Sequence, residues 1–432
     1  MASLEETLQI VSIAPLLKSL TGSSSSHVSP DEIASALALI FENRLSAVQC
    51  SSLLTILHVL KLDRKADVIA KCASCMRDAA TQVDHRSLRE MVRKRGRKEG
   101  SYKGGLCDIV GTGGDGHSTF NISTTASILA SSLLLLSKHG NRASSSTSGS
   151  ADLLQSISPK APNIEAVTSS TLFQVYEKTN YAFLFAPKFH PGMRHVAPIR
   201  KDLGFRTIFN ILGPLANPVE GVIEARVVGV PQRDLGSVFA EALRISGARK
   251  AMVVCGAENL DEISCAGKTF CWRLIERPNP AFRGPKNEED EDYTTSDDEA
   301  PPRTIVEIEE FQLEPADFGL SNHPLSEVSP GKLPKENAEL LVRMLKNKLP
   351  PDDPVLQFVL INTAALFVIS GVCDADSSDM GNGDAGNVIT ERGPGGGRWK
   401  EGIRRARWAV ESGEAFKSLN GFIQVTNNLE FG

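Results

Sequence analysis

The chain has 432 residues, of which 41% are hydrophobic and 23% are charged, and its formal net charge is -5 at pH 7. This length allows more than one domain with a large buried core, and the composition is ordinary for a globular protein. The small negative charge gives no general attraction to nucleic acid or to an anionic membrane, so any anion-binding site has to be local.

The N-terminal segment and the cysteines predict a soluble, cytoplasmic protein. Glu5 and Glu6 stand where a signal peptide would be basic. The longest apolar stretch, SILASSLLLL, is about half as long as the ~20 residues that a membrane helix needs. The eight cysteines are scattered, and the CxxC pair of Cys72 and Cys75 has no second ligand pair nearby. We therefore expect neither a disulfide framework nor a zinc site.

Residues 1–100 are expected to form a small helical domain. Apolar residues recur there at i, i+3 and i+4 in three successive segments, a spacing typical of amphipathic helices. Ser29 and Pro30 supply an N-cap and a first helical residue. The basic run RKRGRKEGSYKGG that follows is interpreted as a solvated linker.

Residues 101–432 are expected to form an α/β domain with a mostly parallel central sheet flanked by helices. Short apolar runs that look like buried strands alternate with helical patterns. The expected strands are LCDIV, YAFLFA, ARVVGV and AMVVCG, and the expected helices include ISTTASILASSLLLLSKH, NIEAVTSSTLFQVYEKT and RDLGSVFAEALRISGA. Residues 276–303 are rich in acidic residues and proline. Residues 375–397 are rich in glycine and aspartate. Because neither can bury enough apolar surface to offset its ordering entropy, both are expected to be mobile surface insertions.

The stretch CDIVGTGGDGHSTFNIS, residues 107–123, predicts a phosphate-binding turn. It places four glycines between a short strand and a helix that starts near Asn121 to Thr124, so consecutive backbone N–H groups can face an anion. It is neither a Walker loop nor a dinucleotide-binding fingerprint. The carboxylate of Asp115 is expected either to orient a sugar hydroxyl or to bind a cation that bridges it to a phosphate. A plain glycine-rich turn is the alternative.

Three further stretches carry candidate ligand-binding residues. Residues 138–154, KHGNRASSSTSGSADLL, offer cationic, amide and hydroxyl groups after an expected helix, although a glycine-serine linker is the alternative. Asp261 and Glu262 follow a strand at the carboxyl edge of the sheet and favour Mg²⁺, unless they form a solvated acidic turn. Residues 186–218 contain His190, Arg194, Arg200 and Arg206 near apolar residues, a combination that suits a small aromatic carboxylate.

The order and spacing of GTGGD, NIST, KHGNR with SGSAD, HPGMRHVAPIRKDLGFRTIFNILGPLANP and LDE closely resemble the anthranilate phosphoribosyltransferase family. The resemblance reaches the C-terminal GIRRARWAVESGEAFKSL and, with the two insertions, is similar to a fungal-type member. It implies a homodimer whose helical domain contributes to dimerisation and to the active-site cleft. It also implies transfer of the phosphoribosyl group of phosphoribosyl pyrophosphate (PRPP) to the amino group of anthranilate, a step of tryptophan biosynthesis.

The resemblance assigns roles to individual residues. For PRPP it implies Gly111, Gly114, Asp115, Thr119, Asn121, Ser123, Thr124, Lys138, Asn141, Arg142, Ser144, Ser145, Ser146 and Ser150. For anthranilate it implies Gly111, Asn141, His190, Arg200 and Pro214. Two Mg²⁺ ions are expected, held by Ser123, Asp261 and Glu262. Lys138, Asp261 and Glu262 are expected to be catalytic, because charge on the departing pyrophosphate needs stabilisation.

Two other classes of protein share features with this sequence. Pyrimidine nucleoside phosphorylases also carry a glycine-rich phosphate loop, but they lack the KHGNR run and the Asp-Glu pair. A non-catalytic nucleic-acid-binding relative would need a basic groove, because phosphate contacts dominate that affinity. The net charge of -5 and the two carboxylates favour the enzyme, with no nucleic-acid partner.

Overall fold

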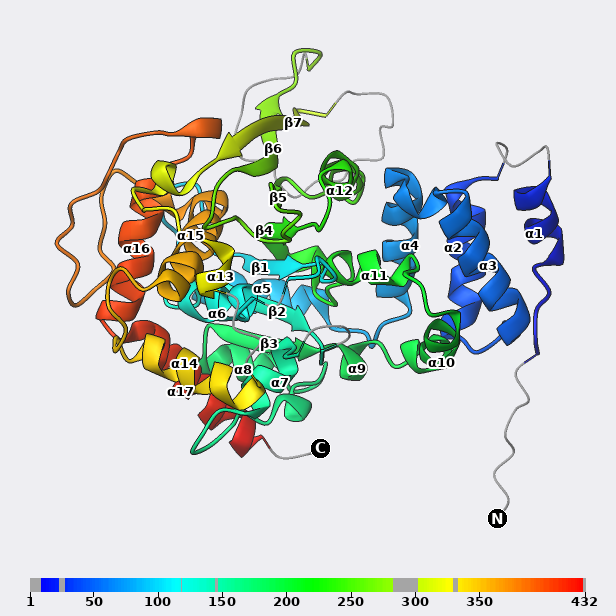
Figure 1. Cartoon of the computed structure of the whole chain (residues 1–432), viewed down its shortest axis with the longest axis horizontal. Coiled ribbons are helices and arrows are strands. Elements are labelled where there is room, and N and C mark those ends of the chain that lie inside the picture. The colour runs from blue at the N-terminus through cyan, green and yellow to red at the C-terminus, as the bar shows by residue number, and fades with distance from the viewer. Residues whose placement is uncertain are drawn as a thin grey trace.

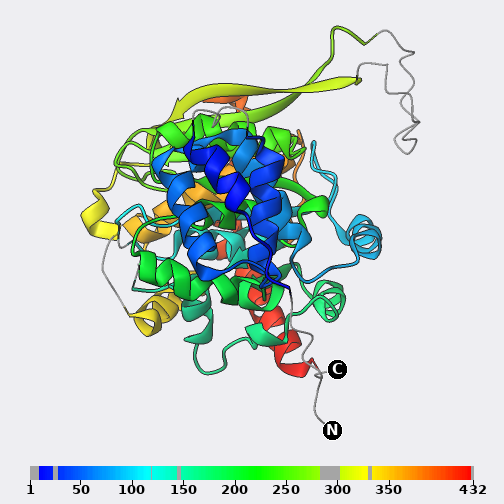
Figure 2. The same cartoon turned by 90° about the vertical axis from the view of Figure 1, so that its right-hand side faces the viewer.

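The computed structural model describes residues 9–22, 28–117, 119–143, 147–282, 302–328 and 333–429. Figure 1 shows a bundle of helices at the N-terminal end beside a larger part built around a sheet, and Figure 2 views the molecule from the bundle side. The expected fold class is confirmed. The bundle consists of α1 (Ala14–Thr21), α2 (Pro30–Phe41), α3 (Ala47–Val59) and α4 (Ala66–Asp78).

The predicted start of α2 is confirmed by a capping box. The backbone N–H of Glu32 donates to Ser29 Oγ at 3.2 Å, and the N–H of Ser29 donates to the Glu32 carboxylate at 2.8 Å. The next helix, α5 (His85–Arg95), buries Leu88 and Val92 in the core of the α/β part. The hydrophobic core therefore changes between α4 and α5, and the boundary at residue 100 stays a prediction.

Across the described ranges, seven strands form a sheet in the order β3-β2-β1-β4-β5-β6-β7. The first five are parallel, whereas β6 and β7 are antiparallel at one edge. The bounds are β1 (Leu106–Gly111), β2 (Leu135–Gly140), β3 (Tyr181–Phe185), β4 (Ile223–Gly229), β5 (Lys250–Gly256), β6 (Thr269–Pro278) and β7 (Thr304–Leu313). The four predicted strands are β1, β3, β4 and β5.

Both faces of the parallel strands are covered, which explains why their sequences are almost wholly apolar. Successive side chains of a strand point to opposite faces. Along β5, Met252 and Val254 belong to one buried cluster, and Ala251 and Val253 belong to another. The second cluster also contains the core of the helical bundle, so this face of the sheet and the bundle share one hydrophobic core.

The helices form layers on either side of the sheet (Figure 1). On one side α6 (Ile122–Ala130) and α15 (Pro354–Ser370) pack on the strands, with α16 (Trp399–Glu411) outside them. On the other side α12 (Asp234–Ile245) packs on β5 and on α4. The remaining helices are α7 (Ser150–Gln155), α8 (Leu172–Lys178), α9 (Ala186–Phe189), α10 (Met193–Leu203), α11 (Phe209–Leu212), α13 (Leu325–Val328), α14 (Pro334–Leu345) and α17 (Glu414–Asn428). Within the described ranges, no helix is both long and apolar enough to cross a membrane.

Two predicted helices differ from the structure. The stretch NIEAVTSSTLFQVYEKT was expected to be one helix, but it contains a 3-10 turn at Ile164–Ala166 and the separate helix α8. The stretch ISTTASILASSLLLLSKH was expected to be a single helix, but α6 ends at Ala130 and residues 135–140 form strand β2. Short apolar runs fit a buried helix and a buried strand equally well, so their periodicity does not separate the two. Lys138 therefore lies on strand β2, whereas the sequence predicted that it would lie at the end of a helix.

Residues 375–397 are anchored on α16 by polar contacts. Arg404 pairs with Asp384 at 2.7 Å, and the N–H of Ile389 donates to the Glu401 carboxylate at 3.0 Å. The indole N–H of Trp408 donates to the carbonyl of residue 382 at 3.0 Å. The expectation of a mobile insertion considered apolar burial and not these contacts, and it stays a prediction. Residues 283–301 of the acidic insertion lie outside the described residues, although 276–278 belong to β6.

Candidate active site

The glycine-rich loop between β1 and α6 is a tight turn. Gly113, Gly114 and Gly116 have φ values of 71°, 76° and 80°, in the left-handed region that favours glycine. The N–H of Gly113 donates to Asp261 Oδ2 at 2.6 Å. A Cβ at Gly111 would lie 2.4 Å from the same oxygen, so glycine is needed for the carboxylate to approach. The structure thus brings two predicted motifs, the loop and the Asp-Glu pair, into direct contact.

Asp261 and Glu262 form a buried carboxylate pair after β5. Their exposed fractions are 8% and 9%. Burial, and next the charge of Asp115, raise the pKa of Asp261 to about 7. Burial and the charge of Asp261 raise the pKa of Glu262 well above its ordinary value, and the backbone N–H of Ser123 opposes that rise. Ser123, Asp261 and Glu262, the three residues predicted to bind the metal, therefore lie together.

This donor set fits Mg²⁺. A cation beside the pair would relieve the repulsion between the two carboxylates. Within the described parts of the chain, no group of three or more His, Cys, Asp or Glu side chains could hold a metal by itself. Mg²⁺ commonly takes one or two carboxylates and completes its shell with water and phosphate oxygens, so the residues present are sufficient when a phosphorylated ligand is bound.

Lys138 places a buried positive charge at the same end of the sheet. The exposed fraction of Lys138 is only 2%. Burial lowers its pKa, and the carboxylates of Asp108, Glu262 and Asp261 oppose this shift by favouring the charged ammonium. The site therefore contains a buried lysine beside the Asp261–Glu262 pair.

The start of α6 is tied to the segment before α7. Thr124 Oγ1 donates to Ser150 Oγ at 2.8 Å, and Asn121 Nδ2 donates to the carbonyl of Ser148 at 2.8 Å. Asn337 of α14 also donates to Asn121 Oδ1 at 3.1 Å. Three residues predicted to bind PRPP, Asn121, Thr124 and Ser150, are thus brought together. No pattern in the sequence indicated that Asn337 would contact this part of the site.

In the structure, Arg142 contacts neighbouring side chains. Its guanidinium donates to Gln155 Oε1 at 2.7 Å and lies 5.4 Å from the ring centre of Phe185. Asn141 Oδ1 accepts the N–H of Arg142 at 2.8 Å. Thr119 lies in the loop before α6, whereas Ser144, Ser145 and Ser146 are outside the described residues. PRPP contacts of these residues stay predictions.

Three of the residues predicted for anthranilate, His190, Arg200 and Pro214, lie in segments next to the helical bundle. His190 Nε2 is 2.9 Å from the carbonyl oxygen of Ala216, and its ring centre is 5.1 Å from that of His139. Pro214 is buried in the turn before Ala216. The guanidinium of Arg200 lies 5.7 Å from the ring centre of Phe209, and it has no hydrogen bond or ion pair with another described residue. Arg200 is therefore available to an anionic ligand.

Three buried asparagines support these segments without any sequence signal for that role. Asn362 of α15 accepts the N–H of Ile263 at 3.0 Å and so holds the chain directly after Glu262. Asn217 donates to Asp108 and to the carbonyl of Ser137, each at 3.0 Å, and so joins β1 to β2. The third is Asn337, described above. A single asparagine in a long chain is too common to indicate such contacts.

Acidification is expected to destabilise the protein through His190. Burial lowers the pKa of His190 to about 4, below the unfolded value of about 6.5. The unfolded chain therefore binds more protons between these values, and stability is lost as the pH falls through that window. Between pH 7 and pH 5 this histidine alone is expected to contribute a loss of about 2 kcal/mol. His190→Gln, measured by thermal unfolding at both pH values, should show a smaller drop; an equal drop would contradict the assignment.

Comparison with models of protein families shows the broad class of enzyme to which the chain belongs. Residues 103–279 and 300–416 match the α/β domain of the glycosyl transferase family, and residues 15–80 match the helical bundle domain of that family. The fold and the site are those of a glycosyl transferase. The gap in the match falls within the acidic insertion.

Similar individual proteins show the family within that class. The anthranilate phosphoribosyltransferase of Schizosaccharomyces pombe is 36% identical over 90% of this chain and 91% of its own length. The structure of the Saccharomyces cerevisiae enzyme in complex with PRPP and Mg is 32% identical, with a TM-score of 0.74, and the match covers 97% of this chain and 99% of that chain. The structure of the Thermus thermophilus enzyme is 30% identical, with a TM-score of 0.67, over 93% and 96% of the two chains. The chain belongs to the anthranilate phosphoribosyltransferase family.

Proposed function

We propose that this protein transfers the 5-phosphoribosyl group of PRPP to the amino group of anthranilate, giving N-(5-phosphoribosyl)anthranilate and pyrophosphate in tryptophan biosynthesis. The observation that carries the proposal is the meeting of the glycine-rich loop, Lys138 and the Asp261–Glu262 pair at one end of the parallel strands. The structures of the Saccharomyces cerevisiae relative with PRPP and Mg and with 4-fluoroanthranilate support it.

The chemistry follows from charge. The bond from C1 of the ribose to the pyrophosphate oxygen breaks, and positive charge develops on the sugar. The arylamine nitrogen forms the new bond to C1 and then loses one proton to solvent. Lys138 stabilises the negative charge of the departing pyrophosphate, and the loop N–H groups hold its oxygens. The arylamine is already a neutral nucleophile, so positioning replaces a strong general base.

Asp261, Glu262 and Ser123 would hold Mg²⁺, and two ions are proposed with bound PRPP. When bound, Mg²⁺ would neutralise the pyrophosphate as its charge increases. A cytoplasmic homodimer is also proposed. None of the eight cysteines, all within the described ranges, forms a disulfide, which suits a reducing compartment.

Arg200→Gln is expected to raise KM for anthranilate about 10- to 100-fold, because the carboxylate loses a charge-assisted hydrogen-bonding partner. KM for PRPP should change little. Arg200→Lys keeps the charge but loses the planar fork, so an intermediate value is expected. Steady-state kinetics with each substrate varied in turn would measure both constants, and an unchanged KM for anthranilate would remove Arg200 from the pocket.

The proposed function is tested by following the fluorescence of anthranilate with the purified full-length protein. Loss of fluorescence should require PRPP and Mg²⁺ together and should stop when EDTA is added. No loss under any condition, with a folded protein shown by circular dichroism, would refute the proposal.

A further inference from the structure

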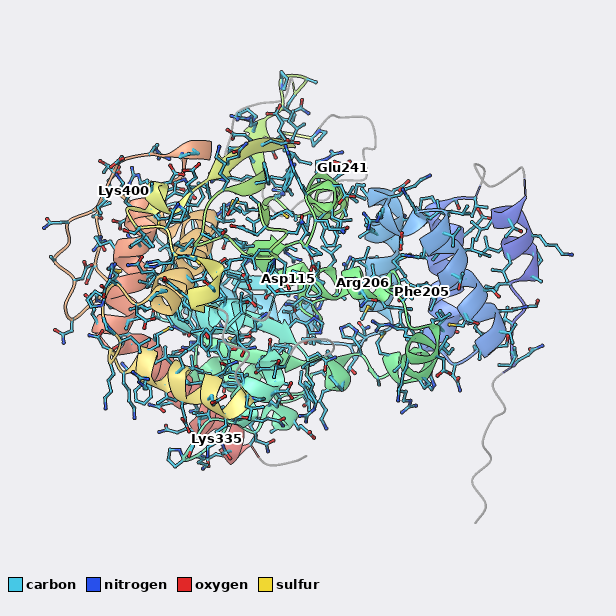
Figure 3. The ribbon with its side chains drawn as sticks, viewed as in Figure 1. Asp115, Phe205, Arg206, Glu241, Lys335 and Lys400 are labelled. Atoms are coloured by element: carbon cyan, nitrogen blue, oxygen red, sulfur yellow. The ribbon has the colours of Figure 1, made fainter. Side chains whose placement is uncertain are left out.

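Arg206 forms hydrogen bonds with the glycine-rich loop, although it lies far from that loop in the sequence. It lies between α10 and α11, and Figure 3 shows it on the side of the sheet that faces the helical bundle, near Asp115. Its Nη1 donates to the carbonyl oxygen of Gly114 at 2.7 Å, and its Nη2 donates to that of Gly113 at 3.1 Å. One guanidinium thus holds two successive carbonyls.

These contacts fix which way the loop peptides point. Successive backbone N–H groups in a tight turn can point to one side and form a concave anion site. Arg206 holds the carbonyl side, and Asp261 accepts the N–H of Gly113. The N–H groups of Gly114 and Asp115 have no partner among the described residues, so they remain available to a ligand.

The backbone around Arg206 is fixed by the helical bundle. The ring centre of Phe205 lies 5.2 Å from that of His58 on α3. On the other side of Arg206, Ile208 is buried in the core that the bundle shares with the sheet. The position of the guanidinium, and hence of the loop carbonyls, therefore depends on how the bundle sits on the α/β part.

We propose that Arg206 is a positioning residue that holds the glycine-rich loop in its anion-binding conformation and links that loop to the helical bundle. It acts through the carbonyls of Gly113 and Gly114 and not by touching the substrate. The consequence for PRPP rests on the proposed function, whereas the effect on the loop does not.

Two variants and a matched control test the inference. Arg206→Gln removes the fork, and Arg206→Lys keeps the charge but cannot hold both carbonyls in the same way. Arg64→Gln is the control, because Arg64 also makes two hydrogen bonds from the bundle to the α/β part, to Asp234 at 2.7 Å and Gln232 at 3.0 Å, far from the loop in sequence. Arg206 is exposed, so its variants are expected to fold.

Hydrogen exchange is measured on the peptide that covers residues 107–117 in the full-length protein without substrates. Arg206→Gln should speed exchange of the hydrogen-bonded loop amides, those of Thr112, Gly113 and His117, about 10-fold or more, since a held turn then opens more often. KM for PRPP should rise about 10-fold with a smaller change for anthranilate, as two hydrogen bonds of typical strength are lost. Arg206→Lys should give intermediate values, and Arg64→Gln should match the wild type.

The other outcomes separate the possibilities. Unchanged loop exchange in Arg206→Gln overturns the inference, and a raised KM for PRPP in that case would mean that Arg206 contacts the substrate itself. Equal acceleration in Arg64→Gln also overturns it, because general loosening between the two parts would then be the cause. A wild type without turnover refutes the proposed function, while loop exchange still decides the role of Arg206.

Discussion

Lys138→Met is expected to lower kcat about 100- to 1000-fold, the range seen when one preorganised electrostatic group is removed from an active site. Methionine keeps most of the buried stem and removes the charge. The departing pyrophosphate then loses its fixed cation, and Asp108, Asp261 and Glu262 lose the ammonium that they surround. Single-turnover kinetics with saturating PRPP, anthranilate and Mg²⁺ would measure the chemical step.

Lys400→Met is the matched control for this substitution. Lys400 is a surface residue that pairs with Glu391 at 2.8 Å, and Figure 3 shows it far from Asp115. It should retain wild-type turnover. Near-normal turnover in Lys138→Met, with the protein folded, would show that the buried ammonium does not stabilise the leaving group.

Asp261→Asn is expected to raise the Mg²⁺ concentration for half-maximal activity about 10-fold or more and to lower the maximal rate. An amide oxygen can still accept the N–H of Gly113, which donates to Asp261 Oδ2 at 2.6 Å in the wild type. The substitution therefore removes the charge that a divalent cation needs while leaving an acceptor for the loop. Activity is measured across a Mg²⁺ titration that starts from an EDTA-treated sample.

A surface carboxylate provides the comparison for Asp261→Asn. Glu241 of α12 pairs with Arg244 at 2.6 Å, so Glu241→Gln changes the net charge by the same amount away from the site. Its Mg²⁺ titration should overlie that of the wild type. If Asp261→Asn also overlies it, Asp261 is not a metal ligand in the working enzyme.

Secondary structure was predicted best where the hydrophobic pattern of the sequence fits a helix or a strand but not both. The amphipathic stripes of the bundle and the helix over Asp234–Ile245 were predicted because polar and apolar faces alternate at helical spacing. The fully apolar stretch before Lys138 has no such contrast, and its strand was missed. The antiparallel β6 and β7 were not predicted either.

In the candidate site, the predicted residues share short motifs, and the missed ones do not. Gly114, Asp115 and Asp261 stand in segments whose composition is unusual enough to indicate a ligand. Asn337 and Asn362 come from helices far along the chain, and only the packing of α14 and α15 brings them to the site. Sequence patterns describe local chemistry, whereas such contacts depend on tertiary packing.

The outermost hairpin gives the enzyme a place where chain length can change freely. Pro278 and Thr304 face each other in register at the end of β6 and β7, so the sheet itself brings the two ends of the acidic insertion together. Each doubling of the chain between two fixed ends costs only about 0.6 kcal/mol of closure entropy. Relatives can therefore gain or lose a segment here while the catalytic end of the sheet keeps its shape. For the same reason, the hairpin is a suitable point at which to insert a reporter domain.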